Sequence, residues 1–209
     1  MKTIFTFDNV VKFVVAISLA FMAFGANAAV NGKVGVASDN IYRGVSISDG
    51  LGYSFGLSTD LSGFKLGANA MSIGDISDTD LMVDSYLSYG WDSEDWSAKI
   101  AYVDHSFVGA DGVDWSEIGG SFTLKEFFTV KYLAGRDEAE DYREISTPLF
   151  PLVDVSYGET SNVGKFWSVS KSFDGLGGVT KIGYVDFSSD IDASFDEDQI
   201  FVSYMRNLF

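Results

Sequence analysis

LGYSFGLSTDLSGFKLGANAMS, residues 51–72, is the stretch of sequence that decides the fold. Large apolar residues alternate with small or polar ones, and the alternation resumes after a turn at Asp60–Gly63. Because successive side chains of an extended chain point to opposite faces, each half presents one apolar and one polar face. Apolar-out, polar-in segments separated by turns are typical of transmembrane β-barrels. The stretch therefore predicts one hairpin of such a barrel.

The N-terminus reads as an export signal. An apolar run, Phe13–Phe24, follows a short region with two lysines, and Ala26–Ala28 forms a small-x-small cleavage site. The run is shorter than the roughly 20 residues that a spanning helix needs. We therefore expect residues 1–28 to be a cleaved signal peptide and residues 29–209 to form one barrel in the bacterial outer membrane.

The amino-acid composition further narrows the class of protein that the sequence allows. The chain carries a net charge of −16, which argues against nucleic acid as a partner because phosphate binding needs clustered Lys and Arg. Twenty-two glycines, 15% aromatic residues and only two prolines suit many short strands and tight turns. The absence of cysteine fits an envelope protein that needs no disulfide.

Counting the alternating runs gives about eleven strands, whereas single-chain bacterial barrels have an even number. The segment 136–158 supplies the missing strand. Asp141–Thr147 can pair, and the chain can turn at Pro148–Pro151 because proline does not donate to a sheet ladder. The prediction is an all-β fold, a single antiparallel transmembrane β-barrel of about 12 strands, with 10–12 allowed.

This count divides the connections into two kinds, which fall at opposite ends of the barrel as bacterial barrels require. The short periplasmic turns are expected at residues 60–63, 91–95, 125–126, 148–151 and 174–178. The outer loops are expected at residues 48–50, 74–80, 108–114, 136–140, 159–164 and 189–198.

Aromatic residues and the C-terminus support a membrane barrel. Four tryptophans lie near expected strand ends, where aromatic girdles belong: Trp91, Trp96, Trp115 and Trp167. The chain ends on Phe209, and outer-membrane barrels commonly end in Phe because the assembly machinery reads the last strand. Phe201 and Met205 share the face of Phe209. The expected partners are therefore the barrel-assembly machinery, outer-membrane lipid and lipopolysaccharide.

Residues 42–49 read Tyr-Arg-Gly-Val-Ser-Ile-Ser-Asp, an aromatic-Arg-Gly-x-Ser-x-Ser-Asp motif. The motif resembles the N-terminal signature of the TorF family of outer-membrane porins. The Ser62–Phe64 turn of the following hairpin is similar as well. The resemblance implies an outer-membrane β-barrel that forms a pore.

Alternation also predicts which charged residues face the lumen. A charge at the lipid-facing midplane costs about 2–4 kcal/mol, so charged side chains within strands are expected to point inward. The lumen-lining candidates are Arg43, Lys65, Asp84, Lys99, Glu117, Lys131, Asp154 and Asp186. For Arg43, pairing with an acidic neighbour that pins the first strand competes with a role in selectivity.

Three functions stay open. The first is a porin-like channel for passive diffusion of small hydrophilic solutes, with inward Lys and carboxylates that filter by charge. The second is a closed structural or adhesive barrel that acts through its acidic loops. The third is a lipid-modifying enzyme, against which His105 and Ser106 point to opposite faces of a strand.

No catalytic, cofactor or metal site is predicted. Residues 189–198 are rich in Asp and Glu, but they lack the regular ligand spacing of a calcium loop. A solvated outer loop, or contact with lipopolysaccharide bridged by divalent cations, is the preferred interpretation.

Overall fold

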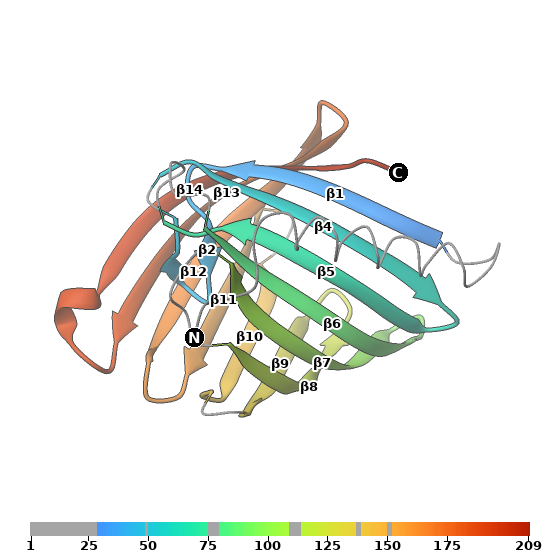
Figure 1. The fold of residues 1–209 in the computed structure, drawn as a ribbon, viewed down its shortest axis with the longest axis horizontal. Coiled ribbons are helices and arrows are strands. Elements are labelled where there is room, and N and C mark those ends of the chain that lie inside the picture. The colour runs from blue at the N-terminus through green and yellow to red at the C-terminus, as the bar shows by residue number, and fades with distance from the viewer. Residues whose placement is uncertain (1–28, 49, 75–79, 109–113, 137–138, 150–151) are drawn as a thin grey trace.

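The computed structural model describes residues 29–48, 50–74, 80–108, 114–136, 139–149 and 152–209. These residues form a closed antiparallel β-barrel of twelve strands, as predicted (Figure 1). The predicted signal peptide lies outside the described residues. So do parts of the expected connections at 48–50, 74–80, 108–114, 136–140 and 148–151. Across the described ranges, no helix is long and apolar enough to span a membrane.

The wall runs in chain order, and its first strand pairs with both its second and its last. Its strands are β1 (Ala29–Ala37), β4 (Gly52–Leu61), β5 (Phe64–Ser72), β6 (Leu81–Asp92), β7 (Trp96–Val108), β8 (Trp115–Leu124), β9 (Phe128–Arg136), β10 (Tyr142–Leu149), β11 (Val153–Thr160), β12 (Gly164–Gly175), β13 (Gly178–Ser189) and β14 (Glu197–Asn207). A single-turn 3₁₀ helix, η2 (Ala193–Phe195), precedes β14. Because β1 pairs with both β4 and β14, the sheet has no free edge.

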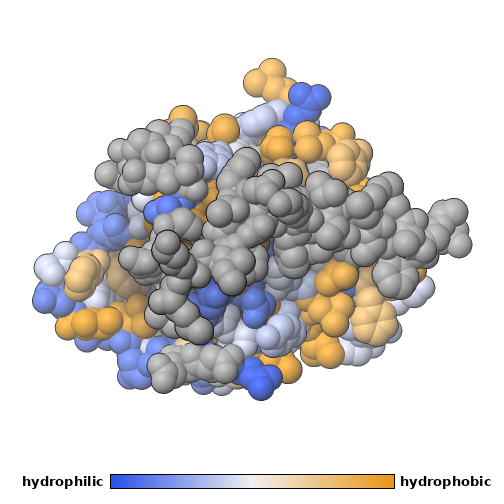
Figure 2. Space-filling view, in the orientation of Figure 1, coloured by the Kyte–Doolittle hydropathy of each residue, from blue (hydrophilic) through white to orange (hydrophobic). Residues whose placement is uncertain are grey.

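The hairpin β4–β5 forms as the alternation predicts. Leu57 lies opposite Ala68, and Thr59 lies opposite Leu66, so the apolar sets of both strands share one face. Ser62 and Gly63 both have positive φ, at 50° and 88°, as a two-residue type I′ turn requires. The apolar set faces outward, and Figure 2 shows hydrophobic residues along the outer surface at the right of the view.

The two ends of the barrel differ as expected. Tight turns join β4–β5, β6–β7, β8–β9 and β12–β13 at one end, here called the turn end. At the opposite end, here called the loop end, β5, β7 and β13 end and β6, β8 and β14 begin, with longer stretches of sequence between the paired strands. The connection from β1 to β4 also lies at the loop end.

That connection folds into the barrel instead of outward. It contains a small hairpin of β2 (Ile41–Tyr42) and β3 (Val45–Ser46), which is visible within the ring of strands in Figure 1. Its turn residues Arg43 and Gly44 have φ of 52° and 89°, again the type I′ pattern. We call residues 40–48 the inner hairpin. The only connection expected near this point was an outer loop at residues 48–50, so the inner hairpin was not predicted.

Three further details differ from expectation. Pro148 belongs to β10 and not to a turn, and it lies beyond Ser146, the last β10 residue that pairs with β9, so a ladder donor is not needed there. Trp115 stacks on His105 in the interior at 4.7 Å instead of joining a girdle. In β14, Phe201 faces inward, whereas Ile200 is 70% exposed on the outer face.

Labelling of single cysteines tests the assignment of faces. The chain has no natural cysteine, so Lys181→Cys and Ile182→Cys each report one side of β13. In liposomes, a charged maleimide should react with Lys181→Cys through the lumen. A fluorophore on Ile182→Cys should be quenched by lipids spin-labelled in their acyl chains. The reverse pattern would show that the faces are assigned wrongly.

Candidate functional site

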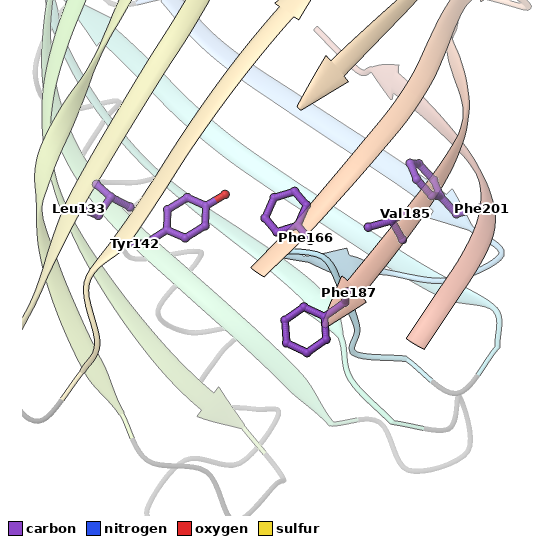
Figure 3. Close-up of a cluster of buried hydrophobic side chains, with 6 residues drawn as sticks. All are labelled: Leu133, Tyr142, Phe166, Val185, Phe187 and Phe201. Carbon is purple, nitrogen blue, oxygen red and sulfur yellow. The ribbon is translucent and has the colours of Figure 1, made fainter. Parts of the chain in front are cut away.

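The inner hairpin packs on an apolar patch of the inner wall. Six buried side chains form this patch (Figure 3): Leu133, Tyr142, Phe166, Val185, Phe187 and Phe201. Ile41 and Val45 of the hairpin pack against it. Gly44 lies so close to the wall that a Cβ there would come within 2.4 Å of the Phe166 Cβ. Only glycine fits this point of the turn.

Arg43 anchors the tip of the hairpin to β8, the strand next to the edge of the apolar patch. Its guanidinium forms an ion pair with Glu117 of β8, whose side chain is fully buried. The same guanidinium lies 4.3 Å from the centre of the Tyr142 ring and 5.0 Å from that of Tyr42, in cation–π geometry. Arg43 therefore pairs with an acidic neighbour, as one of its two interpretations held, and it pins an internal hairpin instead of the first strand.

The pair continues into a chain of charged groups. His105 is buried, with Nδ1 2.7 Å from Asp84 Oδ1 and Nε2 3.1 Å from Glu117 Oε2. An ionised carboxylate only accepts hydrogen bonds, so with Asp84 and Glu117 both ionised both nitrogens of His105 donate and the ring is an imidazolium. Charges then alternate along Asp84, His105, Glu117 and Arg43, and each buried charge has an opposite neighbour. We call these four residues the charge chain.

His105 is only 3% exposed, and its environment does not resemble a serine–histidine dyad. Both ring nitrogens contact carboxylates, so neither faces a serine. Ser106 points to the other face, where its hydroxyl donates to Asp104 at 3.3 Å.

Other contacts fix the base of the hairpin. The N–H of Ser46 donates to Glu197 of β14 at 2.6 Å. The N–H of Asn40 donates to the Ser48 hydroxyl at 2.8 Å, and the Asn40 amide donates to the Ser72 carbonyl at 2.9 Å. The inner hairpin is therefore bound to strands all around the wall.

Two cavities flank the hairpin inside the barrel, and Ile41 and Arg43 line both of them. One, of about 560 Å³, lies toward β1, β4 and β12–β14. The other, of about 550 Å³, lies toward β5–β10. The lumen is divided by the hairpin at its loop end and is not packed solid.

Seven of the eight lumen-lining candidates lie on the inner side of the barrel. Arg43, Lys65, Asp84, Lys99 and Lys131 line the second cavity, Asp154 lines a third cavity of about 390 Å³ near the turn end, and Glu117 is buried behind Arg43. Their part in transport stays a prediction.

Asp186 is the exception, because it lies on the outer face of β13 opposite Trp167. Its neighbours Val185 and Phe187 take the inward positions, where they pack under the inner hairpin. The lumen position expected for Asp186 is therefore wrong.

Several inward residues were missed. Lys33 and Lys181 line the first cavity, and Tyr142 and Glu144 line both. Lys33 shares the inner face of β1 with Gly35, so period-two alternation within Ala29–Ala37 was a signal that could have identified it. Lys181 lies in a segment whose two faces are equally apolar, so local pattern could not assign it.

The acidic loop before β14 uses its carboxylates locally. Asp196 accepts the N–H of Ser189 at 2.7 Å, and Asp192 accepts the N–H of Ser194 at 2.8 Å. The latter bond holds the pKa of Asp192 below its usual range. Within the part of the chain that the structure describes, no group of three or more acidic or His side chains could hold a metal ion.

A closed antiparallel barrel with an apolar outer face and a charged, partly open lumen defines the class of transmembrane β-barrels. Solved structures agree with this class. The chain is similar to a KdgM porin at 8% identity, with a TM-score of 0.53, over 85% of this chain and 98% of that one. It is also similar to a membrane protein solved in a study entitled "Unveiling the Mechanism Behind the in-meso Crystallization of Membrane Proteins", at 9% identity and a TM-score of 0.54, over 85% of this chain and 83% of that one.

At these identities the likeness concerns the fold. No family model and no curated protein sequence matches the chain, so the TorF resemblance stays a prediction.

Removing the Arg43 charge should release the inner hairpin. Arg43→Leu leaves Glu117 buried with one counter-charge fewer, and breaking a buried pair costs about 3–5 kcal/mol. Amide exchange of a peptide covering residues 38–48, followed by mass spectrometry, should accelerate. Arg143→Leu is the matched control, since its pair with Glu159 lies on the outer surface. Equal exchange in both variants would show that the charge chain does not hold the hairpin.

Two glycines with nearly the same positive φ, Gly44 at 89° and Gly50 at 92°, test the close approach to Phe166. Gly44→Ala and Gly50→Ala both place a side chain at positive φ, which costs about 1–2 kcal/mol. Only Gly44→Ala also meets the wall, because a Cβ at position 50 has nothing within 4 Å. The thermal midpoint of the folded barrel, read by gel mobility, should fall further for Gly44→Ala. Equal shifts would mean that the turn is not seated on Phe166.

Proposed function

We propose that this chain is a porin-like channel of the bacterial outer membrane, through which small hydrophilic solutes diffuse passively. The observation that carries the proposal is a closed barrel whose inner wall bears charged residues around open cavities on both sides of an internal hairpin. An inward-folded segment narrows a pore without requiring a moving part. No covalent step and no cofactor enter the mechanism.

Passage depends on the space beside the inner hairpin. At the loop end a solute meets the charge chain, whose charges are mutually neutralised. Toward the turn end it meets charged side chains of the wall, and rings of charge set selectivity where a pore exists. We propose that the inward Lys and carboxylate residues act as this filter.

The proposed channel also has partners, during export and in the outer membrane. The N-terminal segment acts as an export signal, and the last strand with Phe209 is the element that the assembly machinery recognises. The outer face contacts lipid, and the acidic loops at the loop end meet lipopolysaccharide. In the described part of the chain, the β14 residues Ile200, Val202 and Tyr204 share the outer face with lipid.

A closed barrel is the second candidate function. The inner hairpin and the apolar patch fill much of the loop end, which favours a wall-stabilising segment over an open pore. Conductance decides between the two, because a filled lumen passes no ions.

Planar bilayer recordings test the channel directly. Purified protein should give discrete conductance steps, and the unit step should rise in Tyr42→Ala/Arg43→Ala, which shortens two side chains of the inner hairpin. The matched control is Tyr157→Ala/Arg143→Ala, which shortens the same two side-chain types on the outer face and should leave the step unchanged. A silent bilayer with folded protein, for wild type and variant alike, would favour the closed barrel.

A further inference from the structure

Lysine and serine alternate on the inner face of five consecutive strands near the turn end. Lys65 of β5 lies opposite Ser88 of β6. Lys99 of β7 lies opposite Ser121 of β8, which in turn lies opposite Lys131 of β9. We call these five residues the lysine–serine strip.

The strip faces one open space. All five residues line the cavity of about 550 Å³ between the inner hairpin and strands β5–β10. Lys33 and Lys181 face the cavity on the other side of the hairpin. Every one of these five lysines is within the first five residues of a strand that starts at the turn end, which is roughly 17 Å along the strand. The turn-end half of the lumen therefore collects positive charge.

Few carboxylates neutralise the strip. Lys65 lies 3.9 Å from Asp60, and the two side chains are about half exposed, at 41% and 50%. Lys99 makes no ion pair with any residue that the structure describes. Lys131 lies 4.9 Å from the Tyr142 ring centre, and Glu144, its cross-strand neighbour, accepts the Tyr142 hydroxyl at 2.8 Å.

The other two carboxylates near the second cavity, Asp84 and Glu117, already pair with residues of the charge chain. Asp84 contacts His105, and Glu117 contacts both His105 and Arg43. Asp60 and Glu144 are thus the carboxylates nearest to the strip, and two carboxylates offset only part of the charge of three ammonium groups. The hydroxyls between the lysines offer hydrogen-bond donors.

We propose that the lysine–serine strip is a binding site for small solutes that carry two or more anionic groups. Lysines on alternate strands are about 10 Å apart, since neighbouring strands are spaced by about 4.8 Å. A single anionic group can reach one lysine and an adjacent serine, whereas a multivalent anion spans two lysines. This inference rests on the proposed channel and names the solute class that the channel favours.

Calorimetric titration of the folded barrel in detergent tests the site without requiring conductance. Citrate and pyrophosphate serve as carboxylate and phosphate probes, and glycerol serves as a neutral one. The wild-type barrel should bind citrate, pyrophosphate or both, and its affinity should fall as the salt concentration rises. Lys99→Gln/Lys131→Gln should weaken binding by about tenfold for each lysine removed. Lys165→Gln/Lys171→Gln removes the same charge from the outer face of β12 and should bind as wild type.

The outcomes separate the site from the channel. Binding that the lumen variant loses and the outer variant keeps supports the site, and the tighter probe tells carboxylate from phosphate. Absence of binding to folded wild type, or equal binding by both variants, overturns the site even if the barrel conducts. Binding to a barrel that is silent in bilayers keeps the site and overturns the channel.

Discussion

In hydrocarbon, every backbone N–H and C=O needs a partner within the protein, and this constraint shapes the whole molecule. Closure depends on β1, which pairs with β4 along its full length, from Ala29 to Ala37. It pairs with β14 only from Lys33 to Ala37. The last residues of the chain extend the seam to Gly32, whose carbonyl accepts the N–H of Leu208 at 2.8 Å. The C-terminal residues thus complete the wall and are not a loose tail.

Closure in turn creates an interior that must be filled or hydrated, and the two ends of the lumen differ in how this happens. At the loop end, the inner hairpin supplies apolar contacts and a neutralised run of buried charges. Toward the turn end, lysines face open space. A strongly acidic protein therefore carries much of its positive charge inside, where it is kept apart from the acidic loop at 189–198.

The wall could be predicted from the sequence because lipid and lumen impose opposite demands on adjacent residues. Alternation in Leu51–Ser72 fixed which face is outward, and parity required the strand that became β10. The inner hairpin could not be found in this way. It makes part of the inner wall apolar, so Val185 and Phe187 turn inward and Asp186 turns outward, against the rule that charge points to the lumen.

The charge chain was hidden for a related reason. Asp84, His105 and Glu117 are unremarkable in their own strands, and Arg43 lies in a turn. Only the register of β6, β7 and β8 and the docking of the hairpin bring the four residues together. The motif at residues 42–49 overlaps the inner hairpin, but the local sequence pattern does not indicate that this segment folds into the barrel. Contacts between residues far apart in the sequence, such as Arg43 and Glu117, produce no periodic pattern that sequence analysis can detect.

The inner hairpin is near the start of the chain, whereas the residues that pair with it come much later in the sequence. It lies between the first two strands of the wall, yet Arg43 finds Glu117 74 residues later, and Ser46 finds Glu197 151 residues later. Such non-local contacts pay their loop-closure entropy before they return any energy. The N–H of Ser46 therefore has no Glu197 partner until β14, the last strand, is in place. The inner hairpin can make all of its contacts only in a closed barrel. A docked hairpin is therefore a sign that assembly of the barrel is complete.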